Sequence, residues 1–230
     1  MSESLSIVLP TYNEEENIRE IVSDTVSCVA RYTDGFEIIL VDDGSTDRSR
    51  QIINQVRADN LKIKSISHSR RQGYGSAIRT GISLAKGKWV LIMDSDGQYR
   101  IDDFGDFWRS KDNYDFIIGY RVNRKDNLYR RGLAEIGNLL AIILLKKRIK
   151  DINCAFKLFK LEDLKTIPLT SSGNCIYFDI LYNLIRNKDK FAQLPVKHYS
   201  RRNGRQTGGT PKVILRIIWE ALRIICGKKI

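Results

Sequence analysis

The chain has 230 residues, of which 42% are hydrophobic and 29% charged, and its formal net charge is +12. This composition excludes a disordered chain and predicts a folded protein with one sizeable core. The charge is unevenly distributed, because residues 1–118 contain 15 Lys and Arg against 19 Asp and Glu, whereas residues 119–230 contain 24 against 8. The basic second half suggests a polyanionic partner, such as a membrane surface, a phosphorylated substrate or a nucleic acid; the alternative is an ordinary solvated basic surface.

The cysteines are scattered and show neither metal-site nor redox spacing. Cys28, Cys154, Cys175 and Cys226 form no CxxC pair or Cys/His cluster, which predicts buried thiols in a reducing compartment. The chain contains no run of about 18 uncharged apolar residues, and its start leads directly into an apolar strand. We therefore expect a cytoplasmic protein without a secretory signal or a transmembrane helix.

Strands and helices alternate along the first half of the chain. Short apolar runs predict the strands, and amphipathic segments predict the helices, with Ser45 or Thr46 as a cap. Such alternation predicts an α/β fold with a mainly parallel sheet and helices on both faces. The predicted order is strand 6–9, helix 13–29, strand 36–41, helix 46–60, strand 63–67, helix 76–85 and strand 89–93.

The second half has a looser pattern, and the whole chain reads as a single domain. Its predicted elements are strand 116–119, helix 128–147, edge strand 155–159, helix 174–186, a basic glycine-containing loop 201–210 and a final helix 211–226. In the final helix, polar residues recur every three or four positions and form a narrow stripe on an otherwise apolar surface. This pattern is typical of a helix lying in a bilayer interface; packing on the core or on a partner subunit is the alternative. The stripe consists of Lys212, Arg216, Glu220 and Arg223.

Polar segments follow each predicted strand of the first half, at 10–14, 42–45, 70–75 and 94–98. In parallel sheets, ligands bind beyond the carboxyl ends of the strands, so these segments are expected to meet at one rim. Asp42 is expected to contact a ligand there, whereas Asp43 is expected to support the loop.

The segment Asp94-Ser95-Asp96-Gly97-Gln98 follows the buried run 90–93. Asp94 and Asp96 are separated by a single residue in this segment, and one can face a metal while the other faces a ribose or a water. Oxygen ligands without His or Cys nearby suit Mg²⁺ or Mn²⁺. A simple turn is the alternative, because Asp, Ser and Gly all favour turns.

Four motifs in this order resemble the family 2 inverting glycosyltransferases, most closely the dolichyl-phosphate mannose synthase and polyprenyl-phosphate glycosyltransferase branch. They are Ile7–Glu14 (IVLPTYNE), Val41–Asp47 (VDDGSTD), Gly73-x-Gly75-x-Ala77 and Met93–Gln98 (MDSDGQ). The resemblance implies a GT-A fold, with Asp96 and Gln98 at a divalent metal. It also implies nucleotide-sugar contacts from Pro10, Tyr12, Glu14, Asp42 and Asp94.

The second half resembles the same branch less tightly, through Ile118-Gly119-Tyr120-Arg121, Asp151–Phe159 (DINCAFKLF) and the basic segment after His198. Guanidinium groups suit phosphate oxygens, which makes several arginines candidates for holding phosphate. We expect Arg121 and Arg131, with Asp96, to act on the reacting groups. Arg130, Arg201 and Arg202 are expected to hold an acceptor phosphate.

The sequence therefore predicts a metal-dependent enzyme that moves a hexose from a nucleotide-diphosphate sugar to a polyprenyl phosphate, peripherally on the cytoplasmic face of a membrane. The sequence leaves open whether the chain works with a membrane partner subunit or as a homo-oligomer. One alternative is a soluble transferase acting on a glycan or protein hydroxyl, which needs a carboxylate base such as Asp151 or Asp179. The other alternative is a protein that binds a nucleotide sugar without turnover. A nucleic-acid partner is not expected, because the sequence contains no recognition motif for one.

Overall fold

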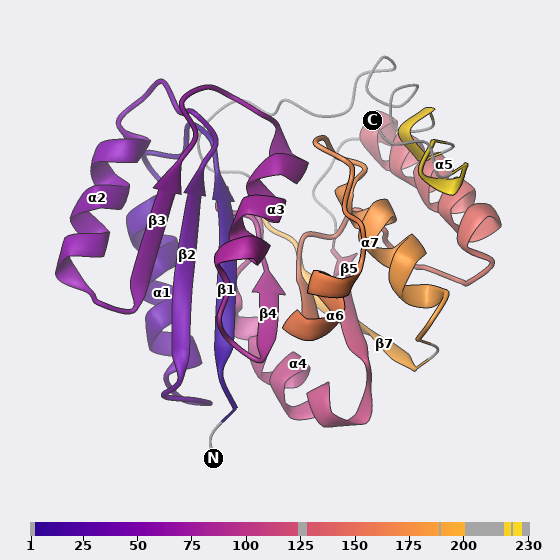
Figure 1. Ribbon diagram of the computed structural model, residues 1–230, viewed down its shortest axis with the longest axis horizontal. Coiled ribbons are helices and arrows are strands. Elements are labelled where there is room, and N and C mark those ends of the chain that lie inside the picture. The colour runs from indigo at the N-terminus through magenta and orange to yellow at the C-terminus, as the bar shows by residue number, and fades with distance from the viewer. Residues whose placement is uncertain (1–2, 124–127, 189, 201–218, 222, 227–230) are drawn as a thin grey trace.

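The computed structural model describes residues 3–123, 128–188, 190–200, 219–221 and 223–226, with only part of the side chains between 128 and 140. Its strands form one seven-stranded sheet in the order β3-β2-β1-β4-β6-β5-β7 (Figure 1). β6 is antiparallel to both of its neighbours, and the other described strands all run in the opposite direction to it. The strands are β1 (Leu5–Thr11), β2 (Phe36–Asp42), β3 (Ile63–Ser67), β4 (Trp89–Ile92), β5 (Phe116–Val122), β6 (Lys157–Lys160) and β7 (Phe191–Lys197).

Helices cover both faces of the sheet, as the alternating pattern predicts. α1 and α2 pack beside each other on one face, while α3 packs against β1 and β2 on the other, beside α6 and α7 (Figure 1). α3 lies close to β1, because a Cβ atom on Gly81 would come within 2.3 Å of Val8 Cγ1. The helices are α1 (Ile18–Val29), α2 (Ser49–Asp59), α3 (Tyr74–Leu84), α4 (Phe104–Ser110), α5 (Leu128–Leu145), α6 (Leu161–Thr166) and α7 (Ile176–Ile185).

The central strands align their carboxyl ends. β1 is buried along its whole length and pairs with β2 from Leu5↔Phe36 to Thr11↔Asp42. β4 pairs with the other side of β1 from Leu5↔Trp89 to Val8↔Ile92. Since these strands are parallel and in matched register, the polar segments that follow them start at the same edge of the sheet.

The prediction that strand 155–159 lies at an edge of the sheet is wrong. β6 lies inside the sheet, with β4 on one side and β5 on the other. The polar/apolar alternation suggested an edge because a lysine usually marks a solvated face. Lys157 is instead fully buried, and its ammonium donates a hydrogen bond to the carbonyl oxygen of Cys154.

Other boundaries differ for local reasons. The first helix begins at Ile18 rather than at residue 13, because Asn13 adopts a positive φ of 55° and bonds to the loop after β2. The second helix begins at Ser49, so neither Ser45 nor Thr46 caps it. The short elements α4, α6 and β7 were not predicted. Among the cysteines, Cys226 is exposed, in contrast to the predicted burial.

Only part of the predicted final helix lies within the described residues, where 219–221 and 223–225 are helical. The prediction that Glu220 belongs to an exposed polar stripe is wrong. Glu220 is buried and accepts a hydrogen bond of 3.1 Å from Ser171 Oγ, because it faces the protein. Trp219 is 55% exposed, and the Arg223 guanidinium lies 4.3 Å from its ring centroid. Within the described residues, none of the helices combines the length and apolar character needed to cross a bilayer.

Candidate functional site

Hydrogen bonds join the loops at the carboxyl edge of the sheet. The Asn13 amide nitrogen donates to Ser45 Oγ at 3.0 Å, and the Thr46 amide nitrogen donates to Asn13 Oδ1 at 2.8 Å. The loop after β4 joins them, because Ser95 Oγ donates to the Pro10 carbonyl oxygen at 2.8 Å. The segments that follow β1, β2 and β4 therefore form one connected rim.

Asp43 connects this rim to the loop after β3. Its Oδ1 accepts a hydrogen bond from the Gln72 amide and its Oδ2 one from the Gly73 amide, both at 2.8 Å. His68 Nδ1 also lies 2.8 Å from Oδ1. Gly73 adopts a φ of +104°, which allows the loop to turn toward Asp43. These bonds agree with the supporting role expected for Asp43.

Asp42 is fully buried at the end of β2. Its Oδ1 accepts a hydrogen bond from the Ser45 amide at 2.9 Å, and its Oδ2 accepts one from Arg50 Nε at 3.0 Å. Burial alone would raise the pKa of this carboxyl, but the bonds from Ser45 and Arg50 outweigh it and hold the pKa below its ordinary value. Asp42 is thus ionised at neutral pH, and its contact with a nucleotide remains a prediction.

The segment after β1 carries the other expected nucleotide contacts. The Arg71 guanidinium lies 4.1 Å from the ring centroid of Tyr12, which brings a cation and an aromatic face to the rim. Glu14 is buried, and its Oε2 accepts a hydrogen bond of 2.7 Å from Asn17 Nδ2. Both residues therefore lie at the rim, and their contacts with a nucleotide stay predictions.

The Asp-x-Asp loop turns directly after β4. Gly97 has a φ of +75°, and Asp96 Oδ1 accepts a hydrogen bond of 3.0 Å from the Gln98 amide nitrogen. The Gln98 side-chain amide donates to the Tyr199 carbonyl oxygen at 3.5 Å, which leaves its own oxygen out of that bond. On the other acid of the loop, Asp94 Oδ1 accepts a hydrogen bond of 2.5 Å from the Tyr74 hydroxyl.

The charge state of Asp94 depends on its deep position. Burial, together with the nearby Asp96 carboxylate, raises the pKa of Asp94 to about 7. The hydrogen bond from Tyr74 and the positive charge of Arg121 act in the opposite direction. The carboxyl therefore exchanges its proton near neutral pH, which is unusual for an aspartate.

Arg121, at the end of β5, forms a bidentate ion pair with Asp151. The Nε–Oδ2 distance is 2.6 Å and the Nη2–Oδ1 distance is 3.0 Å. Burial disfavours the arginine charge, but neighbouring groups that include Tyr99 and Asp151 outweigh it and raise the pKa of Arg121. The arginine is therefore charged and held in one orientation close to Asp94.

The two candidate bases of the second half are both engaged in hydrogen bonds. Asp151 holds Arg121, and Asp179 Oδ2 accepts hydrogen bonds from the amides of Thr170 at 2.7 Å and Ser171 at 2.9 Å. Both carboxylates thus have structural partners. Four expected phosphate ligands cannot be placed, because the side chains of Arg130, Arg131, Arg201 and Arg202 lie outside the described residues.

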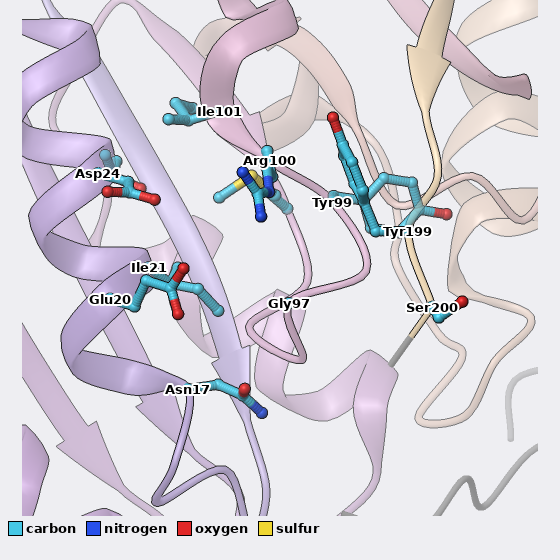
Figure 2. Close-up of a pocket in the computed structure, with 12 residues that line it drawn as sticks. Asn17, Glu20, Ile21, Asp24, Gly97, Tyr99, Arg100, Ile101, Tyr199 and Ser200 are labelled. Carbon is cyan, nitrogen blue, oxygen red and sulfur yellow. The ribbon is translucent and has the colours of Figure 1, made fainter. Parts of the chain in front are cut away.

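A cavity of about 260 Å³ lies beside the Asp-x-Asp loop, on its α1 side (Figure 2). Glu20 and Asp24 of α1 line one wall, and Arg100 and Tyr199 line the other. The Arg100 guanidinium lies 4.8 Å from the Tyr199 ring centroid. The two carboxylates make this wall a poor match for a diphosphate, so the donor is expected at the rim rather than in this cavity.

Three residues near Asp94 were not predicted from the sequence as parts of the site. They are Tyr74, Tyr177 and Lys157. Tyr74 bonds to Asp94, Tyr177 bonds to Tyr74, and the Lys157 ammonium lies over the ring of Tyr177. Tyr74 stands between the two glycines of the third motif, but its contact with Asp94 depends on tertiary packing. The sequence carried no signal for Tyr177.

The fold and the rim together define a GT-A type of protein, a mainly parallel sheet with an Asp-x-Asp loop at the end of its fourth strand. The chain belongs to glycosyl transferase family 2, whose model matches residues 6–181. This confirms the family predicted from the motifs.

Two curated relatives match most of this chain. An undecaprenyl-phosphate 4-deoxy-4-formamido-L-arabinose transferase from Edwardsiella ictaluri is 28% identical over 91% of the chain and 64% of its own length. A dodecaprenyl-phosphate galacturonate synthase from Rhizobium johnstonii is 26% identical over 96% of the chain and 66% of its own length. The chain thus spans somewhat less than two thirds of each relative.

Solved structures of glucosyl-3-phosphoglycerate synthase from Mycobacterium tuberculosis share the fold. The complex with phosphoglyceric acid superimposes with a TM-score of 0.77 at 20% identity, covering 99% of this chain and 81% of the other. The complex with Mn²⁺, UDP-glucose and phosphoglyceric acid gives a TM-score of 0.76 at 19% identity, with the same coverage. These likenesses confirm the predicted fold class.

Proposed function

We propose that this chain is a metal-dependent, inverting glycosyltransferase that moves a sugar from a nucleotide diphosphate to a polyprenyl phosphate at a membrane surface. The observation that carries the proposal is the meeting of the Asp94 and Asp96 carboxylates with the buried Arg121 at one rim. Such a rim offers carboxylate oxygens that can bind a metal, with the fixed guanidinium of Arg121 beside them. The two named relatives, which use undecaprenyl and dodecaprenyl phosphates, support the lipid acceptor.

The reaction is a direct displacement at the anomeric carbon. An oxygen of the acceptor phosphate forms a bond to this carbon as its bond to the diphosphate breaks, and the nucleoside diphosphate leaves with the bonding electrons. The attack comes from the opposite face, so the configuration inverts. A phosphate is already ionised at neutral pH and needs no general base, which agrees with the engagement of Asp151 and Asp179 in other contacts.

The residues present suit a divalent cation that also binds the donor. The described residues contain no group of three or more His, Cys, Asp or Glu side chains able to hold a metal by themselves. Asp96 and Gln98 would supply oxygen ligands, and the diphosphate and water would supply the rest, as is usual for Mg²⁺. When bound, the cation neutralises charge on the leaving diphosphate. Arg121, fixed by Asp151, orients the phosphates beside it.

Affinity for the Mn²⁺–nucleotide complex should depend on pH through Asp94. The pKa of Asp94 is raised to about 7, so the carboxyl is protonated below pH 7 and must lose its proton when the cation and donor bind. Affinity should fall about tenfold for each pH unit below 7 and level off above it. Calorimetry in two buffers of different ionisation enthalpy should detect release of about one proton at pH 6 and almost none at pH 8. Equal proton release at both pH values would contradict this.

The proposed activity is tested by partitioning of label between solvents. Purified protein is incubated with Mn²⁺, a panel of labelled nucleotide sugars, and either undecaprenyl phosphate or 3-phosphoglycerate. Label that enters the organic phase only with undecaprenyl phosphate supports the proposal. Label transferred to 3-phosphoglycerate, or released as free sugar alone, contradicts the lipid acceptor and favours a soluble transferase.

The membrane surface is supported by an exposed apolar face on α5, which lies at the outer end of the molecule beyond α7 (Figure 1). Leu139 and Ile143 are 58% and 59% exposed and lie one turn apart on the same face. Lys146, directly after the end of α5, is also exposed, and Trp219 presents another exposed apolar side chain. Apolar residues flanked by cations are typical of surfaces that bind anionic bilayers.

Replacing Leu139 and Ile143 together by aspartate should abolish flotation of the protein with vesicles that contain an anionic lipid. Each substitution removes an apolar contact and adds a charge repelled by the bilayer surface. The matched control is Leu61→Asp, because Leu61 is 98% exposed in the turn between α2 and β3, away from α5. Flotation of the double variant at the wild-type level would contradict the proposed docking face.

A further inference from the structure

A chain of buried hydroxyl groups reaches Asp94 from the second half of the protein. The Tyr74 hydroxyl lies 2.5 Å from Asp94 Oδ1 and 2.7 Å from the Tyr177 hydroxyl. Tyr74 begins α3, and Tyr177 lies in the first turn of α7, with the two ring centroids 6.0 Å apart. Tyr74 thus bonds directly to one oxygen of the Asp-x-Asp loop, and Tyr177 is linked to that oxygen through the Tyr74 hydroxyl.

The direction of these two hydrogen bonds follows from the number of hydrogens that each group can donate. When Asp94 is ionised, as binding of the donor and cation requires, its carboxylate only accepts hydrogen bonds, and each tyrosine hydroxyl has a single hydrogen to donate. Tyr74 gives its hydrogen to Asp94, so Tyr177 must donate to the oxygen of Tyr74. The Tyr74 hydroxyl bonds to Oδ1 of Asp94 and leaves its Oδ2 out of that bond. That oxygen is the one left for a donor or a cation.

Both tyrosines are held firmly. Lys157 of β6 is fully buried, and its ammonium lies 4.5 Å from the ring centroid of Tyr177. The first turn of α3, which begins at Tyr74, is packed against the backbone of residues 171–173. A Cβ atom on Gly75 would come within 2.7 Å of the Ser171 carbonyl oxygen, and the Ser76 amide donates to the Ser172 carbonyl oxygen at 3.3 Å. Well-supported side chains of this kind fix the residues they contact.

We propose that Tyr74 and Tyr177 are positioning residues that hold Oδ1 of Asp94 and thereby present its Oδ2 to the nucleotide-sugar donor. The proposal rests on the proposed function, since it needs a donor at the rim. Tyr74 acts directly on Asp94, and Tyr177 acts only through the hydroxyl of Tyr74. The second half of the chain therefore shapes the donor site as well as any acceptor site.

Phenylalanine substitutions remove each hydroxyl and keep the ring. Tyr74→Phe should raise the Kd of the Mn²⁺–UDP or Mn²⁺–GDP complex, whichever the wild type binds, by about ten- to hundredfold, because the lost bond was made to a charged group. Tyr177→Phe should raise it by about three- to tenfold. The double variant should match Tyr74→Phe within about twofold, since Tyr177 has no separate route to Asp94. The KM for the acceptor should not change.

Tyr182→Phe is the matched control, because Tyr182 also lies in α7 but stacks on Phe178 and accepts a hydrogen bond from Arg186. Calorimetric binding and thermal unfolding are measured for every variant. A folded Tyr74→Phe protein with wild-type affinity would overturn the proposal, as would additive effects in the double variant. If Tyr74→Phe does not fold, Tyr177→Phe decides: unchanged affinity overturns the proposal, and a threefold or larger loss supports it. Wild-type protein that binds the complex but transfers no sugar to lipid contradicts the proposed function and leaves the positioning test intact.

Discussion

Replacing Asp96 by asparagine should lower kcat/KM by about two to three orders of magnitude without unfolding the protein. The substitution removes a negative charge proposed to hold the cation that stabilises the leaving diphosphate, and the loss of one such preorganised electrostatic contact has an effect of this size. The fold should survive, because the asparagine oxygen can still accept the hydrogen bond that Asp96 Oδ1 receives from the Gln98 amide. Steady-state kinetics and thermal unfolding together separate the two effects.

The control for Asp96→Asn is Asp106→Asn, which makes the same chemical change on an exposed residue of α4. Asp106 forms an exposed ion pair with Arg109, three residues further along α4, so this variant should keep its activity within about twofold. A second arm raises the Mn²⁺ concentration, which should partly restore Asp96→Asn if the residue binds the cation. Activity of Asp96→Asn within threefold of the wild type at low Mn²⁺ would rule out the metal role of Asp96.

The first half of the fold could be predicted because its signals are local. β1, β2 and β4 are mostly apolar and almost entirely buried, and polar segments follow them closely. Once the strands were read as parallel, their carboxyl ends had to meet at one edge of the sheet. The rim formed by the loops after β1, β2 and β4 is therefore a consequence of strand polarity alone.

The contacts that orient the acidic loop could not be predicted in this way. The hydroxyls of Tyr74 and Tyr177 meet across 103 positions, and Arg121 pairs with Asp151 across 30. Neither pairing leaves a periodic pattern, because each depends on how β6 inserts between β4 and β5. The same insertion buries Lys157, whose charge had suggested an edge strand. Long-range packing here overrides the local polarity of the sequence.

The inward orientation of Glu220 has the same origin. Its spacing with other polar residues predicted a solvated stripe, but Ser171 offers it a buried hydrogen-bond partner. The neighbouring Trp219, about 100° around the helix from Glu220, is exposed. Trp219 therefore adds an exposed apolar side chain to the surface proposed to face a bilayer.

Removing the partner of Arg121 should have the largest effect on stability. In Asp151→Ala, a guanidinium that is only 12% exposed loses its bidentate carboxylate, and breaking this ion pair should lower the free energy of unfolding by about 3–5 kcal/mol. Asp151→Asn should lose less, because the amide oxygen can still accept one of the two hydrogen bonds. Urea unfolding of the purified variants measures both values.

The double variant Arg121→Met, Asp151→Leu separates stability from activity. Replacing a whole buried ion pair by apolar residues of similar size is often neutral for stability, so unfolding should return to within about 1–2 kcal/mol of the wild type. Transfer should nevertheless stay at least about a hundredfold below the wild type, because the fixed guanidinium of Arg121 then no longer faces the phosphates beside Asp94. A stable double variant with normal turnover would show that the Arg121–Asp151 pair supports only the fold. A stable and inactive one would show that the ion pair exists because the rim needs a fixed positive charge, and that Asp151 acts on the reaction by keeping that charge in place.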